Sequence, residues 1–161
     1  NPQLASYLPG VEEGALVVGL NCFRGPDTML PALERVRAAV PGHVAGLPVP
    51  YRTTGNEPTF FHMHDHHCPV PLAEGRTFPT ALEPFSTNRY ESAAYARAAA
   101  DMGVRYLGLC CGNTPAHMRE MAMTLGRTPP AARYAPDMDK HFLFGADPRL
   151  KAHVRGYADE A

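Results

Sequence analysis

Three short apolar segments, each followed by a turn and a stretch of helical character, constrain the fold of this chain more than any other feature. Residues 15–21 (ALVVGLN) have the length and the Val- and Leu-rich character of a buried strand. Residues 43–51 (HVAGLPVPY) predict a second strand, which should end near Leu47 because prolines follow. Residues 104–109 (VRYLGL) predict a third strand. Strands that alternate with helices are typical of the α/β class, in which helices cover a parallel sheet.

The segments between and after these strands carry helix signals. Apolar residues recur three or four positions apart after the first strand, and Asp27 or Thr28 is expected to cap this helix. The expected helices span residues 27–40, 90–102, 114–125 and, in the tail, 148–157. A long irregular segment, residues 52–88, follows the second strand. Loops of this length within a compact domain are usually functional or mobile.

Charge and hydropathy exclude two classes of partner. The 15 Lys and Arg residues nearly balance the 16 Asp and Glu residues, so the formal net charge is −1. A chain of this charge lacks the basic face that nucleic acids and membrane surfaces require. No apolar run in the sequence approaches the roughly 18 residues of a membrane span. We therefore expect a protein that acts on neither nucleic acids nor membranes.

The chain contains four cysteines, which are Cys22, Cys68, Cys110 and Cys111. An even number permits two disulfides, as in a secreted domain. However, 161 residues exceed the size of the small scaffolds that depend on disulfides, and adjacent cysteines bridge each other poorly. We therefore expect reduced thiols and a cytoplasmic protein.

Three of these cysteines directly follow predicted strands. Cys22 comes after the first strand, and Cys110 and Cys111 come after the third, so all three should lie at the carboxyl edge of the sheet. Three thiolates suit a zinc ion, and three protein ligands leave a fourth position open, as in catalytic sites. Such a centre favours alkylation of an incoming thiol, because a zinc ion with three thiolates activates water poorly. In the alternative interpretation, these cysteines only fill space at the strand ends.

The motifs around these cysteines resemble those of a known family. GLNC (Gly19–Cys22) and GLCCG (Gly108–Gly112) are similar to the two zinc-binding motifs of the homocysteine S-methyltransferase domain. Three longer segments are most like the betaine-type enzymes of that family: LPVPYRTT (Leu47–Thr54), ALEPFSTNRYE (Ala81–Glu91) and MGVRYLGLCCGNTPAHMREMA (Met102–Ala122). The resemblance is good from about Glu13 to Met123 and weaker in the tail.

The resemblance implies a fold and a chain organisation. The family's domain is a TIM (β/α)8 barrel, of which this chain would form the C-terminal part, about three βα units, incomplete as it stands. Residues 1–126 would be the C-terminal half of the homocysteine-binding barrel, with a His-rich loop at about 55–80, and residues 127–161 an extension that contacts another subunit. Three parallel strands cannot close into a barrel, so we expect a homo-oligomer or a partner chain that completes it. Because the chain begins with Asn1 and not Met, we also expect a processed or cut chain.

The resemblance also implies a reaction. Zinc would be held by Cys22, Cys110 and Cys111, and the thiol of homocysteine would take the open position. Methyl transfer from betaine or a related onium compound would then give methionine, and aromatic residues would attract the cationic donor. The residues that bind the substrates remain unassigned. The alternative is a non-catalytic, metal-binding half-barrel, or a subunit that needs a partner chain.

A cluster of histidines lies within the irregular segment. The sequence FFHMHDHHC, residues 60–68, carries imidazole, carboxylate and thiol groups that bind Zn, Ni or Cu. In an extended segment, His62, His64 and His66 would point the same way and form a second metal site. The alternatives are a solvated loop with biased composition, and a pH-sensitive or partner-contacting loop.

Two further features have structural interpretations. Glu83 could act as an acid or a base, but the resemblance to the family favours a strand-end carboxylate that supports the fold. Met118, Met121 and Met123 have roughly helical spacing and are expected to belong to the core.

Overall fold

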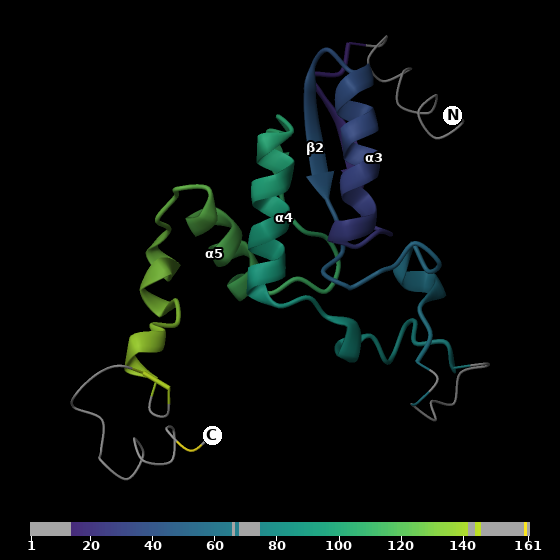
Figure 1. The fold of residues 1–161 in the computed structure, drawn as a ribbon. Coiled ribbons are helices and arrows are strands. Elements are labelled where there is room, and N and C mark those ends of the chain that lie inside the picture. The colour runs from purple at the N-terminus through teal and green to yellow at the C-terminus, as the bar shows by residue number, and fades with distance from the viewer. Residues whose placement is uncertain (1–13, 66, 68–74, 142–143, 146–159, 161) are drawn as a thin grey trace. The chain divides into compact units, whose positions relative to one another are not determined.

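The computed structural model describes residues 14–65, 67, 75–141, 144, 145 and 160. The chain divides into two compact units, residues 1–129 and residues 130–161 (Figure 1). In the second unit, the described residues form two short 3₁₀ helices, Pro130–Tyr134 and Met138–Lys140. The helix expected at residues 148–157 lies outside the described residues.

The first unit contains a parallel sheet of three strands in the order β1-β2-β3. These strands are β1 (Val17–Asn21), β2 (His43–Leu47) and β3 (Tyr106–Leu107). The prediction of an α/β fold with a parallel sheet is confirmed, as is the end of the second strand at Leu47. Because the strands pair in chain order, their carboxyl ends follow one another along one edge of the sheet.

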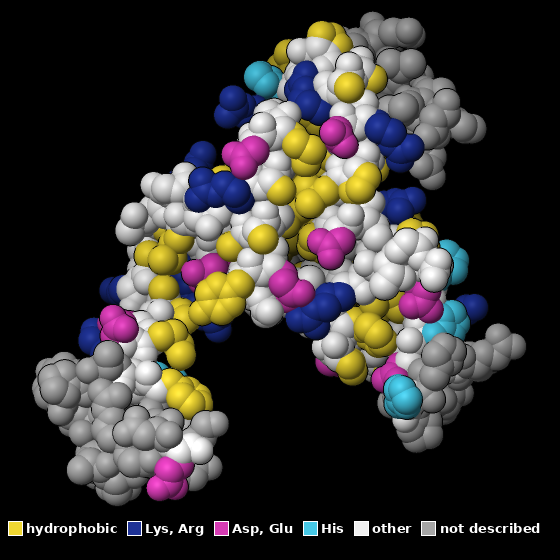
Figure 2. Space-filling view, in the orientation of Figure 1, with side chains coloured by type: hydrophobic (Ala, Val, Ile, Leu, Met, Phe, Trp, Pro, Cys, Tyr) yellow, Lys and Arg dark blue, Asp and Glu magenta, His cyan; other side chains and the backbone are white. Residues whose placement is uncertain are grey.

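Three helices of the described residues accompany the sheet: α3 (Pro26–Ala39), α4 (Arg89–Asp101) and α5 (Pro115–Thr124). Each corresponds to a predicted helix, with ends that differ by a residue or two. No helix in the described part of the chain is both long and apolar enough to cross a membrane. On the face visible in Figure 2, side chains of both charge signs are interspersed, which agrees with the near-zero net charge.

The predicted cap of α3 is wrong. Gly25 occupies the cap position and Pro26 the first helical position, where the missing N–H of proline costs nothing. The Thr28 hydroxyl instead lies 2.6 Å from the Thr53 hydroxyl, which accepts the N–H of Gly25 at 2.9 Å. The start of α3 is therefore bonded to the segment that follows β2.

The helices α3 and α4 cover the same face of the sheet. A side chain at Gly46 of β2 would meet both Leu33 of α3 and Tyr95 of α4, so both helices pack against this point. Leu33, Tyr95 and the neighbouring Val44 are at most 2% exposed and belong to one core cluster. No helix among the described residues covers the opposite face, where Val17 is 44% exposed. Parallel sheets are normally covered on both faces.

The third strand is shorter than predicted. Only Tyr106–Leu107 pairs as a regular strand, although the chain runs beside β2 over a longer stretch. The N–H groups of Arg105, Gly108 and Cys110 bond to the carbonyls of Val44, Gly46 and Pro48 at 2.7–3.2 Å. From Arg105 to Gly108 the chain advances three residues, whereas their partners in β2, Val44 and Gly46, are two residues apart. One extra residue therefore interrupts the regular hydrogen-bond pattern.

The methionines of α5 only partly match the expectation. Met121 is buried in the core and Met123 is half-buried, but Met118 is 38% exposed. Met118 lines a cavity of about 340 Å³ beside Tyr106 of β3. Met118 therefore lies beside β3, the last strand of the described sheet, and not in the core.

Candidate metal centre

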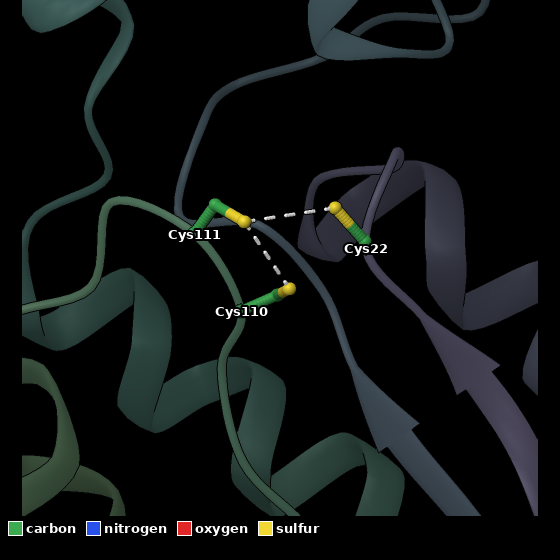
Figure 3. A group of neighbouring side chains, drawn as sticks. All are labelled: Cys22, Cys110 and Cys111. Atoms are coloured by element: carbon green, nitrogen blue, oxygen red, sulfur yellow. Dashed lines mark hydrogen bonds between the residues drawn. The ribbon is translucent and has the colours of Figure 1, made fainter.

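Three cysteine sulfurs meet at the carboxyl edge of the sheet (Figure 3). The Sγ atom of Cys111 lies 3.9 Å from that of Cys22 and 3.5 Å from that of Cys110. All three sulfurs lie within 4.8 Å of one another, and the three cysteines are free thiols. Cys22 and Cys110 are half-buried and Cys111 is exposed, so a ligand can approach from the side of Cys111.

Hydrogen bonds to one short segment bring these sulfurs together. The N–H of Cys22 donates to the carbonyl of Leu47 at 2.9 Å, and the N–H of Cys110 donates to the carbonyl of Pro48 at 2.7 Å. These carbonyls belong to consecutive residues at the end of β2. Cysteines far apart in the sequence are therefore fixed on either side of the same strand end.

The backbone at Cys22 adopts an uncommon conformation. Cys22 and Phe23 have φ values of 65° and 62°, in the left-handed region that residues other than glycine seldom occupy. The Phe23 carbonyl accepts the N–H of Phe60 at 2.9 Å, and the Arg24 carbonyl accepts the N–H of Val49 at 3.0 Å. Such strain costs of the order of 1–3 kcal/mol per residue and is typical of functional sites.

A tyrosine lies against the cysteine pair. A side chain at Gly112, which has a φ of 87°, would come within 2.3 Å of the Tyr51 hydroxyl oxygen. Burial raises the pKa of the Tyr51 phenol, and negative charge on Glu83 and Cys111 raises it further. The phenol therefore remains protonated at neutral pH and can donate a hydrogen bond.

An aromatic cluster packs beside the sulfurs. Phe60 and Met63, which are 6% and 1% exposed, belong to a small core cluster against which Cys22 and Cys110 pack. The rings of Phe23 and Phe61 lie 5.4 Å apart, and Phe23 is 53% exposed. Phe23 and the irregular segment thus together place an apolar, partly exposed wall next to the thiols.

The donor set suits a soft, tetrahedral metal ion. Two sulfurs bound at about 2.3 Å to one tetrahedral zinc ion lie about 3.8 Å apart. The two closest sulfur pairs here, at 3.5 and 3.9 Å, are close to this spacing. Cys22, Cys110 and Cys111 could therefore hold zinc with little movement, and three ligands would leave a fourth position for another group.

Two histidines of the predicted metal site have hydrogen-bonding partners within the irregular segment. His62 ends the 3₁₀ helix Phe60–His62, so the segment is not extended there as the prediction requires. The Nδ1 atom of His62 lies 2.6 Å from the Thr59 hydroxyl, and that of His64 lies 2.9 Å from a carboxylate oxygen of Glu57. His66 and Cys68 lie outside the described residues, so a metal site that includes His66 stays a prediction.

The sequence analysis predicted no role for some residues of the site, and it expected one residue in a different structural element. Glu83 begins the 3₁₀ helix Glu83–Phe85 and is exposed, so the expectation of a strand-end carboxylate is wrong. Tyr51 and Phe23 carry no sequence signal that sets them apart from core aromatic residues. Gly112 could have been found, because a glycine directly after two cysteines at a strand end suggests a tight turn.

The structure thus defines the chain as an α/β protein with a parallel sheet and a three-thiol centre at the carboxyl edge of that sheet. Comparison with known families places it more narrowly. Residues 4–125 match the family described as homocysteine S-methyltransferase. The chain belongs to this family.

Curated relatives support this assignment. The chain is 38% identical over 151 residues to betaine–homocysteine S-methyltransferase 1 of Danio rerio, covering 90% of this chain and 34% of the relative. It is 34% identical over 155 residues to an S-methylmethionine–homocysteine S-methyltransferase of Pongo abelii, covering 92% of this chain and 39% of the relative. The chain thus spans about a third of the length of the curated relatives it matches.

Proposed function

We propose that this chain supplies the zinc-binding portion of a homocysteine S-methyltransferase, with betaine or a related onium compound as methyl donor. The observation that carries this proposal is the convergence of Cys22, Cys110 and Cys111, whose sulfurs lie within 4.8 Å of one another. Family membership makes homocysteine the expected thiol substrate. The names of the two relatives described above include betaine and S-methylmethionine, which are both onium compounds.

The sheet supports a place in the C-terminal part of a (β/α)8 barrel. Its strands pair in chain order, and α3 and α4 cover one face, whereas a doubly wound sheet reverses its order and carries helices on both faces. In a barrel, the other face becomes the interior. The remaining strands would come from another part of the protein, from a second copy or from a partner chain.

The residues of this chain have distinct roles in the proposal. Cys22, Cys110 and Cys111 would hold the zinc ion, and the exposed side of Cys111 leaves room for a substrate thiol. A zinc ion so bound supplies a site at which a fourth thiol loses its proton while its sulfur stays nucleophilic. Phe23 and Phe61 provide an apolar wall that excludes water from the thiol and can face an onium group.

The test is a methyl-transfer assay on the complete protein, with the part that supplies the remaining strands present. Homocysteine should be converted to methionine with betaine or S-methylmethionine as donor, and a chelator should abolish the activity until zinc is restored. Cys111→Ser should lower the turnover at least 100-fold, whereas His43→Ala, a substitution of an exposed residue at the start of β2, should leave it unchanged.

Two results would contradict the proposal. If the protein binds zinc but no onium compound serves as a methyl donor to homocysteine, it is the non-catalytic, metal-binding half-barrel. Full activity in Cys111→Ser would show that the cysteine cluster is not the reacting centre.

A further inference from the structure

A buried histidine links the start of α5, which follows the cysteine pair, to the segment that precedes α4. His117 is 7% exposed and lies in the first turn of α5. Its Nδ1 atom accepts the N–H of Thr114 at 3.1 Å, and its Nε2 atom lies 2.8 Å from the carbonyl oxygen of Thr87. Thr114 caps α5, and Thr87 directly precedes the cap of α4.

These two partners define which nitrogen carries the proton. A backbone N–H can only donate, so Nδ1 must be unprotonated; a carbonyl can only accept, so Nε2 must carry the hydrogen. One imidazole ring thus satisfies a free N–H at the start of α5 and connects it to the segment before α4. A residue that only capped α5 would not need the hydrogen bond from Nε2 to the Thr87 carbonyl.

The bonds made by His117 complete a series of hydrogen bonds that leads from β2 back to the cysteine pair. The N–H of Thr87 donates to the carbonyl of Pro50 at 2.9 Å, and Pro50 lies two residues after Pro48, whose carbonyl holds Cys110. On the other side, the Asn113 amide donates to the carbonyl of Cys110 at 2.8 Å, and Thr114 follows Asn113 directly. The segment 110–114 is therefore held at one end by Pro48 and at the other by His117.

We propose that His117 is a positioning residue that holds Cys110 and Cys111 in register with Cys22 for metal binding. The inference rests on the proposed three-cysteine zinc site. Without the bond to Thr87, the start of α5 can shift relative to β2, and Cys111 moves with it. Because the Cys111 sulfur lies within 3.9 Å of each of the other two sulfurs, this movement disturbs the geometry of the whole three-sulfur site.

Two substitutions separate this role from helix capping. In His117→Gln, the side-chain amide offers an acceptor and a donor separated by one carbon, as the imidazole does, so both bonds can form. In His117→Glu, the carboxylate still caps Thr114, as glutamate does in capping boxes, but it cannot donate to the Thr87 carbonyl. Val36→Ala, near the C-terminal end of α3, is the control for a general loss of stability.

The measurement is a titration of the reduced, metal-free protein with Co²⁺, followed by its thiolate charge-transfer absorption. We expect His117→Gln and Val36→Ala to bind Co²⁺ within about threefold of the wild type, and His117→Glu to bind about tenfold more weakly. Unfolding curves for each variant would confirm that the comparison is made on folded protein.

The outcomes distinguish this inference from the metal site itself. Equal Co²⁺ affinities of folded His117→Glu and His117→Gln would overturn the positioning role while the cysteine site stands. An equal loss in Val36→Ala would also overturn it, because stability alone would then explain the effect. A wild-type chain without a charge-transfer band would refute the metal site, and the inference with it.

Discussion

Single residues determine how the three sulfurs reach one point. The left-handed conformations of Cys22 and Phe23 turn the chain directly after β1, and that of Gly112 turns it directly after the cysteine pair. Residue types with chemical meaning, such as the cysteines, could be recognised from the sequence. Tyr51 and His117 could not, because their roles depend on contacts between segments far apart in the chain.

The contact between Gly112 and Tyr51 gives a prediction. Gly112→Ala should lower the stability and weaken zinc binding about tenfold, because the added methyl group strains the backbone and displaces Tyr51 or Cys111. Gly126→Ala is the matched control: Gly126 also has a positive φ, of 76°, but no atom lies within 4 Å of an added Cβ.

Denaturant unfolding and zinc titration together check this prediction. Both variants should lose of the order of 1–2 kcal/mol of stability from backbone strain. Only Gly112→Ala should lose zinc affinity, so an equal affinity in the two variants would show that the Tyr51 contact does not position the thiols.

Secondary-structure elements were predicted well where local signals define them. Asn88 caps α4, because its side chain accepts the N–H groups of Tyr90 and Glu91, and local side-chain bonds of this kind can be read from sequence. The ends of β3 could not be predicted, because they depend on an extra residue opposite β2. The cap of α3 was missed because Thr28 bonds to Thr53, a residue distant in the sequence.

The start of α4 predicts a pH dependence. Both carboxylate oxygens of Glu91 accept hydrogen bonds from Arg52 at 2.7 Å, and one also accepts the Asn88 N–H at 2.6 Å. The hydrogen bond from Arg52 is the main cause that lowers the pKa of Glu91. Because the folded-state pKa is depressed, the stabilisation is present above the unfolded pKa of about 4.3 and is lost as the pH falls through the folded value.

Glu91→Gln tests this dependence, because glutamine can still accept the Asn88 N–H but carries no charge. At pH 7, the variant should be less stable by a few tenths to about 1 kcal/mol, since the ion pair is exposed to solvent. Thermal unfolding between pH 7 and pH 3 should show the two proteins converging in acid. A difference that persists unchanged at pH 3 would argue against the ion pair as its cause.

For the molecule as a whole, the parallel sheet follows from the alternation of strands and helices in the sequence, but the strand order β1-β2-β3 was found only in the structure. The irregular segment 52–88 could be recognised as unusual, but not its apolar packing against the thiols, because Phe60 and Met63 show no periodic pattern. The histidine pattern suggested an extended chelating edge, whereas a 3₁₀ helix at Phe60–His62 interrupts it. The cysteines are therefore the cluster on which the functional proposal depends.

Zinc content tests this central claim most directly. We expect one zinc ion per complete site in the wild-type protein, measured by atomic absorption after extensive dialysis. Cys110→Ser should lose this zinc, because two thiolates and a hydroxyl hold the ion far more weakly. His64→Ala, in the histidine-rich segment, should retain it. Unchanged zinc in Cys110→Ser, or zinc lost in His64→Ala, would contradict the account.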